Sequence, residues 1–199
     1  MRNQIKLFVG RSYAVFSENN GGLSAEEGFA ILDTWLKKPT GKDQMIQVHL
    51  DPERFTEVLK QFGFNYSRAA GGLVFGPEKG LWLIRRWGFW DLPKGKCEYQ
   101  EEDDVCALRE VKEECSLMDV RIERFAANTY HAFSMHNKKF VKRTAWFIMS
   151  SRQQWAKPQV EEDIEEVRLV PLNDLPDYMP EMHLNLQYLL KETFPELMR

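Results

Sequence analysis

The stretch from residue 103 to residue 115 constrains this chain more than any other feature. Ala107, Val111 and Cys115 recur there at the spacing that puts them on one face of a helix. Directly beside that apolar face, three carboxylates fall within an arc of about 100° of the helix circumference. These carboxylates belong to Glu110, Glu113 and Glu114. A helix of this kind has to pack against other elements while it holds a group of acids at the edge of the packing.

The close carboxylates repel one another, and a bound cation relieves that repulsion. Mg²⁺ and Mn²⁺ favour oxygen ligands, and proteins usually hold Mg²⁺ with a few carboxylates together with the phosphates of a substrate. Arg109 lies off the acidic side and can pair with Glu101, which would fix the preceding loop against the helix. A solvated helix face is the alternative interpretation, because glutamate is common on exposed helices.

Composition and charge exclude several classes of protein. The 199 residues carry 27 Lys and Arg against 30 Asp and Glu, so the formal net charge of −3 disfavours broad nucleic-acid binding. No apolar run approaches the ~20 residues that span a bilayer, and Lys6 and Arg11 interrupt any apolar core of a secretion signal. The three cysteines form no CxxC pair, which suits a reducing compartment. We therefore expect a soluble, cytoplasmic, globular protein that does not associate with membranes.

The first 66 residues alternate between strand-like and helix-like stretches and predict a small α/β extension, whose role the sequence leaves open. Ser24 and Glu27 form a capping-box pattern ahead of one helix. Asp51 followed by Pro52 is the pattern of a second helix start. The expected elements are strands at 4–9, 12–17 and 45–50 and helices at 24–36 and 51–61.

Residues 67–199 predict a second, larger domain, and Gly63 precedes its boundary. Stretches 87–95 and 158–166 are expected as loops because of their Gly, Pro and clustered acids, and the pattern at 128–138 favours no one state. The remaining expected elements are strands at 69–75, 81–86, 121–127, 139–149 and 167–170, and helices at 103–115 and 183–194.

The segment that ends with the acidic helix resembles the Nudix box, G-x5-E-x7-R-E-U-x-E-E-x-G-U, in which U is an aliphatic residue. The only departure is Ser116, which stands where the family has glycine, and serine reaches the positive φ of a helix end at modest cost. The resemblance covers residues 67–172 and implies an α/β (α+β) fold, the Nudix α/β/α sandwich with a mixed sheet, preceded here by the small α/β segment. The matching residues are Gly95, Glu101, Arg109, Glu110, Val111, Glu113, Glu114 and Leu117.

A resemblance to the Nudix hydrolase superfamily, of the MutT-like kind, implies a metal-dependent pyrophosphohydrolase. Such an enzyme cleaves a phosphoanhydride bond in a nucleoside diphosphate linked to another moiety, by attack of water on phosphorus. More than one Mg²⁺ or Mn²⁺ ion would be held by Glu113 and Glu114, with Glu110 a further ligand or the general base. The other implied positions are Arg109 and Glu101 as catalytic residues, the Gly95 backbone as a metal ligand, and Glu161 or Glu162 as a further carboxylate from a later loop.

Basic residues flank the acids and can hold the phosphates of a substrate. Because successive residues of a strand point to opposite faces, only one of Arg85 and Arg86 is expected to face the site. Tyr130 is a candidate for stacking on a base, although core packing is the commoner role of such a residue. The candidate substrate-binding residues are Arg85, Arg86, Lys94, Lys96, Lys142 and Tyr130.

The substrate class stays open at this level. The sequence from Trp90 to Gly95 is similar to that of Nudix enzymes acting on dinucleoside polyphosphates or diphosphoinositol polyphosphates. Met135 and Phe133 stand where a tyrosine would mark dinucleoside polyphosphate hydrolases and a proline would mark ADP-ribose hydrolases, so neither marker is met.

Other activities are compatible with the same resemblance. They include an ADP-ribose or nucleoside triphosphate house-cleaning hydrolase, and an isomerase or decapping-type activity. A ligand-sensing or regulatory domain, with residues 1–66 as an interaction module, is a further alternative. The intact glutamates favour an enzyme, because a sensor need not keep them. The expected partner is a phosphorylated small molecule, and the resemblance leaves a homodimer open.

Overall fold

The computed structural model describes residues 4–18, 21–38 and 42–195. The chain divides into two compact units, each built from two stretches of sequence. The first unit comprises Met1–Ser67 and Thr129–Arg143, and the second comprises Arg68–Asn128 and Thr144–Arg199. The boundary that the sequence places after residue 66 adjoins the observed one, whereas the stretch Thr129–Arg143 groups with the N-terminal unit rather than with the larger domain.

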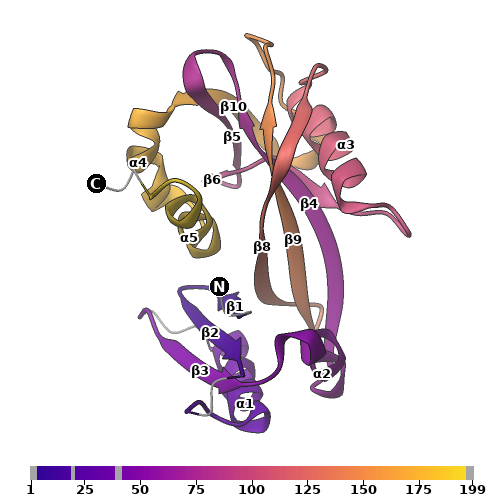
Figure 1. Cartoon of the computed structure of the whole chain (residues 1–199), viewed down its shortest axis with the longest axis vertical. Helices are drawn as coiled ribbons and strands as arrows, with labels where there is room; N and C mark the ends of the chain where they lie inside the picture. Colours follow the sequence, from indigo (N-terminus) through magenta and orange to yellow (C-terminus); the bar gives the residue numbers. More distant parts are fainter. Residues whose placement is uncertain (1–3, 19–20, 39–41, 196–199) are drawn as a thin grey trace. The chain divides into compact units, whose positions relative to one another are not determined.

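The first unit combines a small sheet with two helices. Strands β1 (Ile5–Val9) and β2 (Ser12–Ser17) form the antiparallel hairpin that the sequence predicts, and β3 (Met45–His49) runs parallel to β2. The helices are α1 (Ala25–Lys37) and α2 (Phe55–Gln61), which are labelled in Figure 1. Their apolar faces meet the strands in one core, whose buried residues include Leu7, Phe16, Phe29, Leu32 and Phe55.

The helices of the first unit begin at the predicted caps. The Glu27 backbone N–H donates to the Ser24 hydroxyl at 3.2 Å, and the Ser24 N–H donates to the Glu27 carboxylate at 2.9 Å. Asp51 caps the second start, where a 3₁₀ turn (Pro52–Arg54) precedes α2. Local side-chain chemistry therefore fixes both starts.

The second unit places helices on both faces of a sheet. Three long strands, β4 (Phe64–Phe75), β8 (Arg121–Met135) and β9 (Lys138–Ser150), contribute residues to it as well as to the first unit. The strand order here is β10-β5-β4-β9-β8. The other elements are β5 (Gly80–Arg86), β10 (Ile164–Pro171), α3 (Asp103–Cys115), α4 (Leu175–Tyr178) and α5 (Leu184–Thr193).

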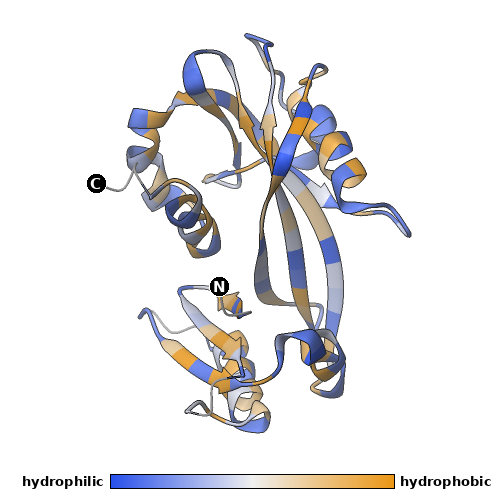
Figure 2. Ribbon diagram, in the orientation of Figure 1, coloured by the Kyte–Doolittle hydropathy of each residue, from blue (hydrophilic) through white to orange (hydrophobic). Residues whose placement is uncertain are grey.

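The two helical layers cover opposite faces of this sheet, as Figure 1 shows for α3 and α5. Trp82 and Ile84 of β5 pack with residues of α3, while Leu81 and Leu83 pack with residues of α5. Figure 2 shows hydrophobic and hydrophilic residues following one another along α3, as expected of a helix with one apolar face. The α/β/α sandwich is thereby confirmed.

Both strand directions occur in the chain. Strand β5 pairs antiparallel with β10, and β1 pairs parallel with β8, so the sheet is mixed as predicted. Within the described part of the chain, no helix is long and apolar enough to cross a membrane.

The stretch 87–95 is not the uninterrupted loop that its Gly and Pro residues suggest. It contains two short strands, β6 (Phe89–Asp91) and β7 (Lys94–Lys96), which pair antiparallel with β5 and β4. The two strands form because neighbouring strands supply their hydrogen-bond partners, and local composition carries no signal of those partners.

Two other intervals are also more regular than the sequence indicates. Residues 128–138 complete β8 and β9, which meet at His136 and Asn137, both with positive φ. Strand β10 already begins at Ile164, inside the expected acidic loop, after a 3₁₀ turn at Val160–Glu162. Pairing of β10 with β5 extends the strand into this polar stretch.

Candidate active site on helix α3

Helix α3 spans the residues that the sequence predicts, and Ser116 ends it. The Ser116 backbone is left-handed, with φ 55° and ψ 30°, which is the conformation that a glycine at this position would favour. Its hydroxyl donates to the Lys157 carbonyl at 3.2 Å. The serine therefore adopts the helix-ending conformation, and the departure from the box leaves the helix intact.

Gly95 allows the buried carboxylate of Glu110 to approach the chain before the helix. A Cβ atom on Gly95 would lie 1.8 Å from Glu110 Oε2 and 2.1 Å from Cδ, far inside van der Waals contact. Glu110 is only 5% exposed. Burial raises the pKa of the Glu110 carboxyl, and hydrogen bonding to Arg109 opposes that rise. The glycine of the box is thus required by a contact between two segments.

Arg109 joins three of the acidic residues. Its Nε and Nη2 atoms donate to the two carboxylate oxygens of Glu101, each at 2.9 Å, which confirms the predicted pair. Its Nη1 donates to Glu110 at 2.7 Å and to Glu113 at 2.9 Å. The Arg109 guanidinium also lowers the pKa of Glu101 to about 2, against the opposing effect of burial. One guanidinium therefore fixes the loop against the helix and orients two carboxylates of α3.

Glu114 is fully buried and only half satisfied. Its Oε2 accepts a hydrogen bond from the Lys94 backbone N–H at 2.7 Å, whereas its Oε1 has no hydrogen-bond partner. The Arg86 guanidinium lies near Oε1, with its Nη1 atom 3.8 Å away. Burial raises the pKa of Glu114 to about 7, although the Lys94 charge acts in the other direction. A buried carboxylate oxygen without a donor is the kind of atom that a cation satisfies.

The two arginines at the end of β5 point to opposite faces, in keeping with strand alternation. Arg86 faces Glu114 on the α3 side. Arg85 lies 3.4 Å from Glu181 and over the ring of Trp90, on the α5 side. Of this pair, Arg86 alone is therefore in position to serve the acidic site.

The two lysines of the box region take different positions. The Lys94 ammonium pairs with Asp91 at 2.9 Å, and both side chains are largely buried. Lys96 is exposed, and its carbonyl accepts a hydrogen bond from Arg109 at 3.2 Å. Asp91 is not among the residues that the sequence predicts for the site. It lies two residues before Pro93, and no local pattern there indicates its ion pair with Lys94.

The later acidic loop reaches the site through its backbone. The Gln159 N–H donates to the Glu114 carbonyl at 3.2 Å, and the Lys157 N–H donates to the Cys115 carbonyl at 3.0 Å. The charge of Glu162 contributes to the raised pKa of Glu110, so this side chain lies near the acids of α3. Glu161, its neighbour, is exposed.

Two candidate substrate-binding residues belong to the first unit. Tyr130 packs edge-on against Phe55 at 5.6 Å between ring centroids, as part of the core of that unit. Lys142 lies on β9 in the same unit. Tyr130 thus has the packing role that is commoner for such a residue.

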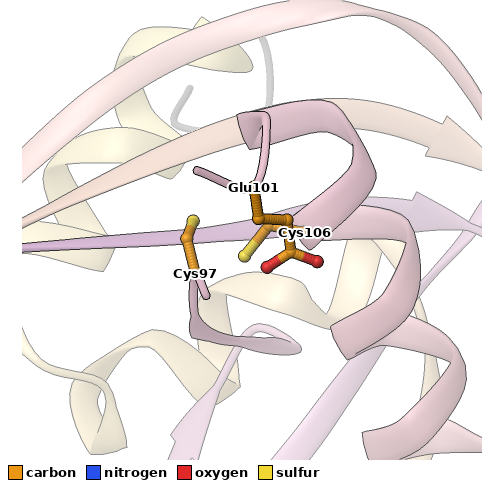
Figure 3. Close-up of side chains that lie close together, drawn as sticks. All are labelled: Cys97, Glu101 and Cys106. Carbon is orange, nitrogen blue, oxygen red and sulfur yellow. The ribbon is translucent and has the colours of Figure 1, made fainter. Parts of the chain in front are cut away.

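A second group of potential ligands lies within the box, and Figure 3 shows its side chains close together. One donor atom each from Cys97, Glu101 and Cys106 falls within 4.8 Å of the others. The Glu101 oxygens are already bound by Arg109, and Arg109 Nη2 lies 3.9 Å from Cys106 Sγ. Burial raises the pKa of both thiols, which keeps them neutral. A dication fits this group poorly, because both Glu101 oxygens already accept from the guanidinium and both thiols are neutral.

Comparison with known proteins decides the family. The NUDIX domain family matches residues 65–192, which is more than half of the chain. The chain belongs to the NUDIX family. This membership identifies the protein as a hydrolase that acts on phosphorus-containing anhydrides, with a phosphorylated small molecule as substrate.

Solved NUDIX structures share the fold. A MutT protein from Methanosarcina mazei Go1 is 20% identical, with a TM-score of 0.56 over 68% of this chain and 98% of its own. A binary complex of the C. elegans Ap4A hydrolase is 16% identical, with a TM-score of 0.52 over 66% of this chain and 97% of its own. At these identities the likeness concerns the fold alone.

Proposed function

We propose that this NUDIX protein is a metal-dependent pyrophosphohydrolase that uses more than one Mg²⁺ or Mn²⁺ ion. Its substrate would be a nucleoside diphosphate linked to another moiety. One observation carries the proposal: the buried Glu114 Oε1 has no hydrogen-bond partner and lies on the helix face that also holds Glu110. Carboxylate oxygens are ligands that Mg²⁺ and Mn²⁺ favour.

The ligands would come from α3 and from the chain beside it. Glu113 and Glu114 would hold the ions, Glu110 would be a further ligand or the general base, and the Gly95 carbonyl and Glu162 would complete the set. When bound, divalent ions neutralise phosphate oxygens and make water a better nucleophile. Water attack on phosphorus then breaks the anhydride bond, and the departing phosphate takes the bonding electron pair.

The basic residues of the site have distinct tasks in this proposal. Arg109 positions Glu110 and Glu113 through its hydrogen bonds and need not touch the substrate. Arg86 and Lys94 would neutralise substrate phosphates, because both lie next to the buried acids. Lys96, which is exposed, would meet phosphates farther from the reacting atom. Arg85 has no place in the proposal, because it faces the α5 side.

The test is hydrolysis by the full chain with Mg²⁺ or Mn²⁺. The panel contains diadenosine tetraphosphate, ADP-ribose, NADH, nucleoside triphosphates and diphosphoinositol phosphates. Glu113→Gln and Glu114→Gln should each lower kcat by orders of magnitude on whichever substrate is cleaved, with unchanged circular dichroism. Glu102→Gln is the matched control, because this exposed residue lies at the start of the same helix and its side chain makes no capping bond. Near-normal turnover in both α3 variants would refute the metal-site assignment.

A regulatory domain is the second candidate. Its support is the N-terminal stretch of the first unit, residues 1–64, which precedes the box and lies outside the family match. Absence of hydrolysis across the whole panel, together with metal-dependent binding of one of its members, would favour that function over catalysis.

A further inference from the structure

Two large aromatic side chains lie exposed at the hairpin that joins β5 to β6. Trp87 is 68% exposed and Phe89 is 46% exposed. Trp87 and Gly88 form the two-residue turn, with φ 51° and 77°. A bulky residue at positive φ is uncommon, and here the residue in that conformation carries a largely exposed indole. The core does not use these two rings.

The exposed rings lie on the side of the sheet that carries the acids. Phe89 is directly opposite Arg86 in the β5–β6 pair, so both side chains leave the same face. That face is the α3 side, since Arg86 Nη1 is 3.8 Å from Glu114 Oε1. The Arg86 guanidinium also lies over the Trp87 ring, 4.6 Å from its centroid. Arg86 therefore connects the indole to the buried carboxylate.

The opposite face of the same hairpin is arranged differently. There Trp90 is only 3% exposed and is covered by Arg85 and Arg168, which lie 5.3 Å and 5.0 Å from its ring centroid. The Phe89 ring stacks on the His183 imidazole, with 4.9 Å between the ring centroids and 21° between the ring planes. The hairpin thus buries its aromatic ring on the α5 side and presents two rings to solvent on the α3 side.

We propose that Trp87 and Phe89, with Arg86 between them and the acids, form a base-binding subsite, here called the aromatic rim. The ligand would be a nucleotide whose base stacks on the rim while Arg86 holds the adjacent phosphate. This inference rests on the proposed function and deepens it, because it assigns Trp87 and Phe89 to the recognition of the substrate's base. Exposed aromatic rings suit any base, because each base offers a π face.

The charge pattern supports a nucleotide as the occupant. A nucleobase is planar and neutral, and its phosphates are anionic. The rim offers rings at its outer end and a guanidinium at its inner end, in the order that a base and its phosphates require. A non-aromatic polyphosphate would use the cation and leave both rings in water.

Binding of two probes that differ only in the base tests the rim. The probes are ADP and ribose 5-diphosphate, each titrated calorimetrically with Mg²⁺ into the full chain. We expect tighter binding of ADP by the wild type. Trp87→Gly should weaken ADP binding roughly 5- to 150-fold, the range of one aromatic–base stack, and leave ribose 5-diphosphate unchanged. Glycine accepts the positive φ of the turn, so this variant should keep the fold.

Two further variants complete the design. Trp87→Phe should retain most of the preference for ADP, and Trp155→Ala is the matched control, an indole that is 63% exposed on another loop of the same unit. Equal affinity of the wild type for both probes, or equal weakening of both by Trp87→Gly, would overturn the proposal. The test is separate from catalysis: if Glu113→Gln and Glu114→Gln both hydrolyse normally, the metal-site assignment fails while the preference for ADP is unaffected.

Discussion

Replacing Gly95 by alanine would place a methyl group inside the Glu110 carboxylate. The added Cβ would lie 1.8 Å from Oε2, and real Cβ contacts are essentially never below 3.0 Å, so the two atoms have to separate by at least 1.2 Å (3.0 − 1.8). Glu110 cannot simply withdraw, because Arg109 holds its other oxygen at 2.7 Å and the side chain is buried. The substitution therefore moves a carboxylate of the proposed site or shifts strand β7.

The expected losses follow from that displacement. A misplacement of about 1 Å in a catalytic group costs on the order of 100-fold in rate, so kcat of Gly95→Ala should fall by about that factor. Overpacking of a filled site costs about 1–3 kcal/mol, which should lower the free energy of unfolding in urea by that amount.

A matched glycine controls this experiment. A Cβ on Gly21 would have nothing within 4 Å, so Gly21→Ala should change neither kcat nor stability appreciably. Wild-type kcat and an unchanged urea midpoint for Gly95→Ala would refute the reasoning, because they would mean that Glu110 and the β7 segment do not approach each other as closely as described.

Three further predictions concern titratable groups of the site. Hydrogen bonding to Arg109 lowers the pKa of Glu101 from 4.5 to about 2, so the ionised carboxylate stabilises the fold above pH 4.5 and this effect fades as pH falls toward 2. The difference in the free energy of unfolding in urea between wild type and Glu101→Gln should therefore shrink from pH 4.5 to pH 2. A difference that stays constant over this range would contradict the prediction. Burial raises the pKa of Glu114 from 4.5 to about 7, so the free energy of unfolding is highest below pH 4.5 and falls as pH rises from 4.5 to 7. Metal-free Glu114→Gln should therefore gain Tm over metal-free wild type at pH 8 but much less at pH 5, and equal differences would argue against the burial of this charge. Burial raises the pKa of the thiols of Cys97, Cys106 and Cys115, so iodoacetamide at pH 8 should label them slowly in the native protein and fully in urea, as mass spectrometry would show.

The sequence by itself determined the features that depend on neighbours along the chain. The capping box at Ser24 and Glu27, the bounds of α3 and the pairing of Arg109 with Glu101 all involve groups within eight residues of one another. Helix periodicity and cap chemistry are local, so they can be read from the order of residues. The fixed spacing of the box identified the family for the same reason.

Tertiary structure decided what depends on contacts between distant segments. It selected Arg86 over Arg85, left one oxygen of the buried Glu114 without a donor, and extended β8 and β9 through residues 128–138. It also exposed Trp87 at the end of the face that holds the acids. Sheet pairing and burial are set by segments far apart in sequence, and no local pattern of residue types records which partner a strand or a carboxylate will meet.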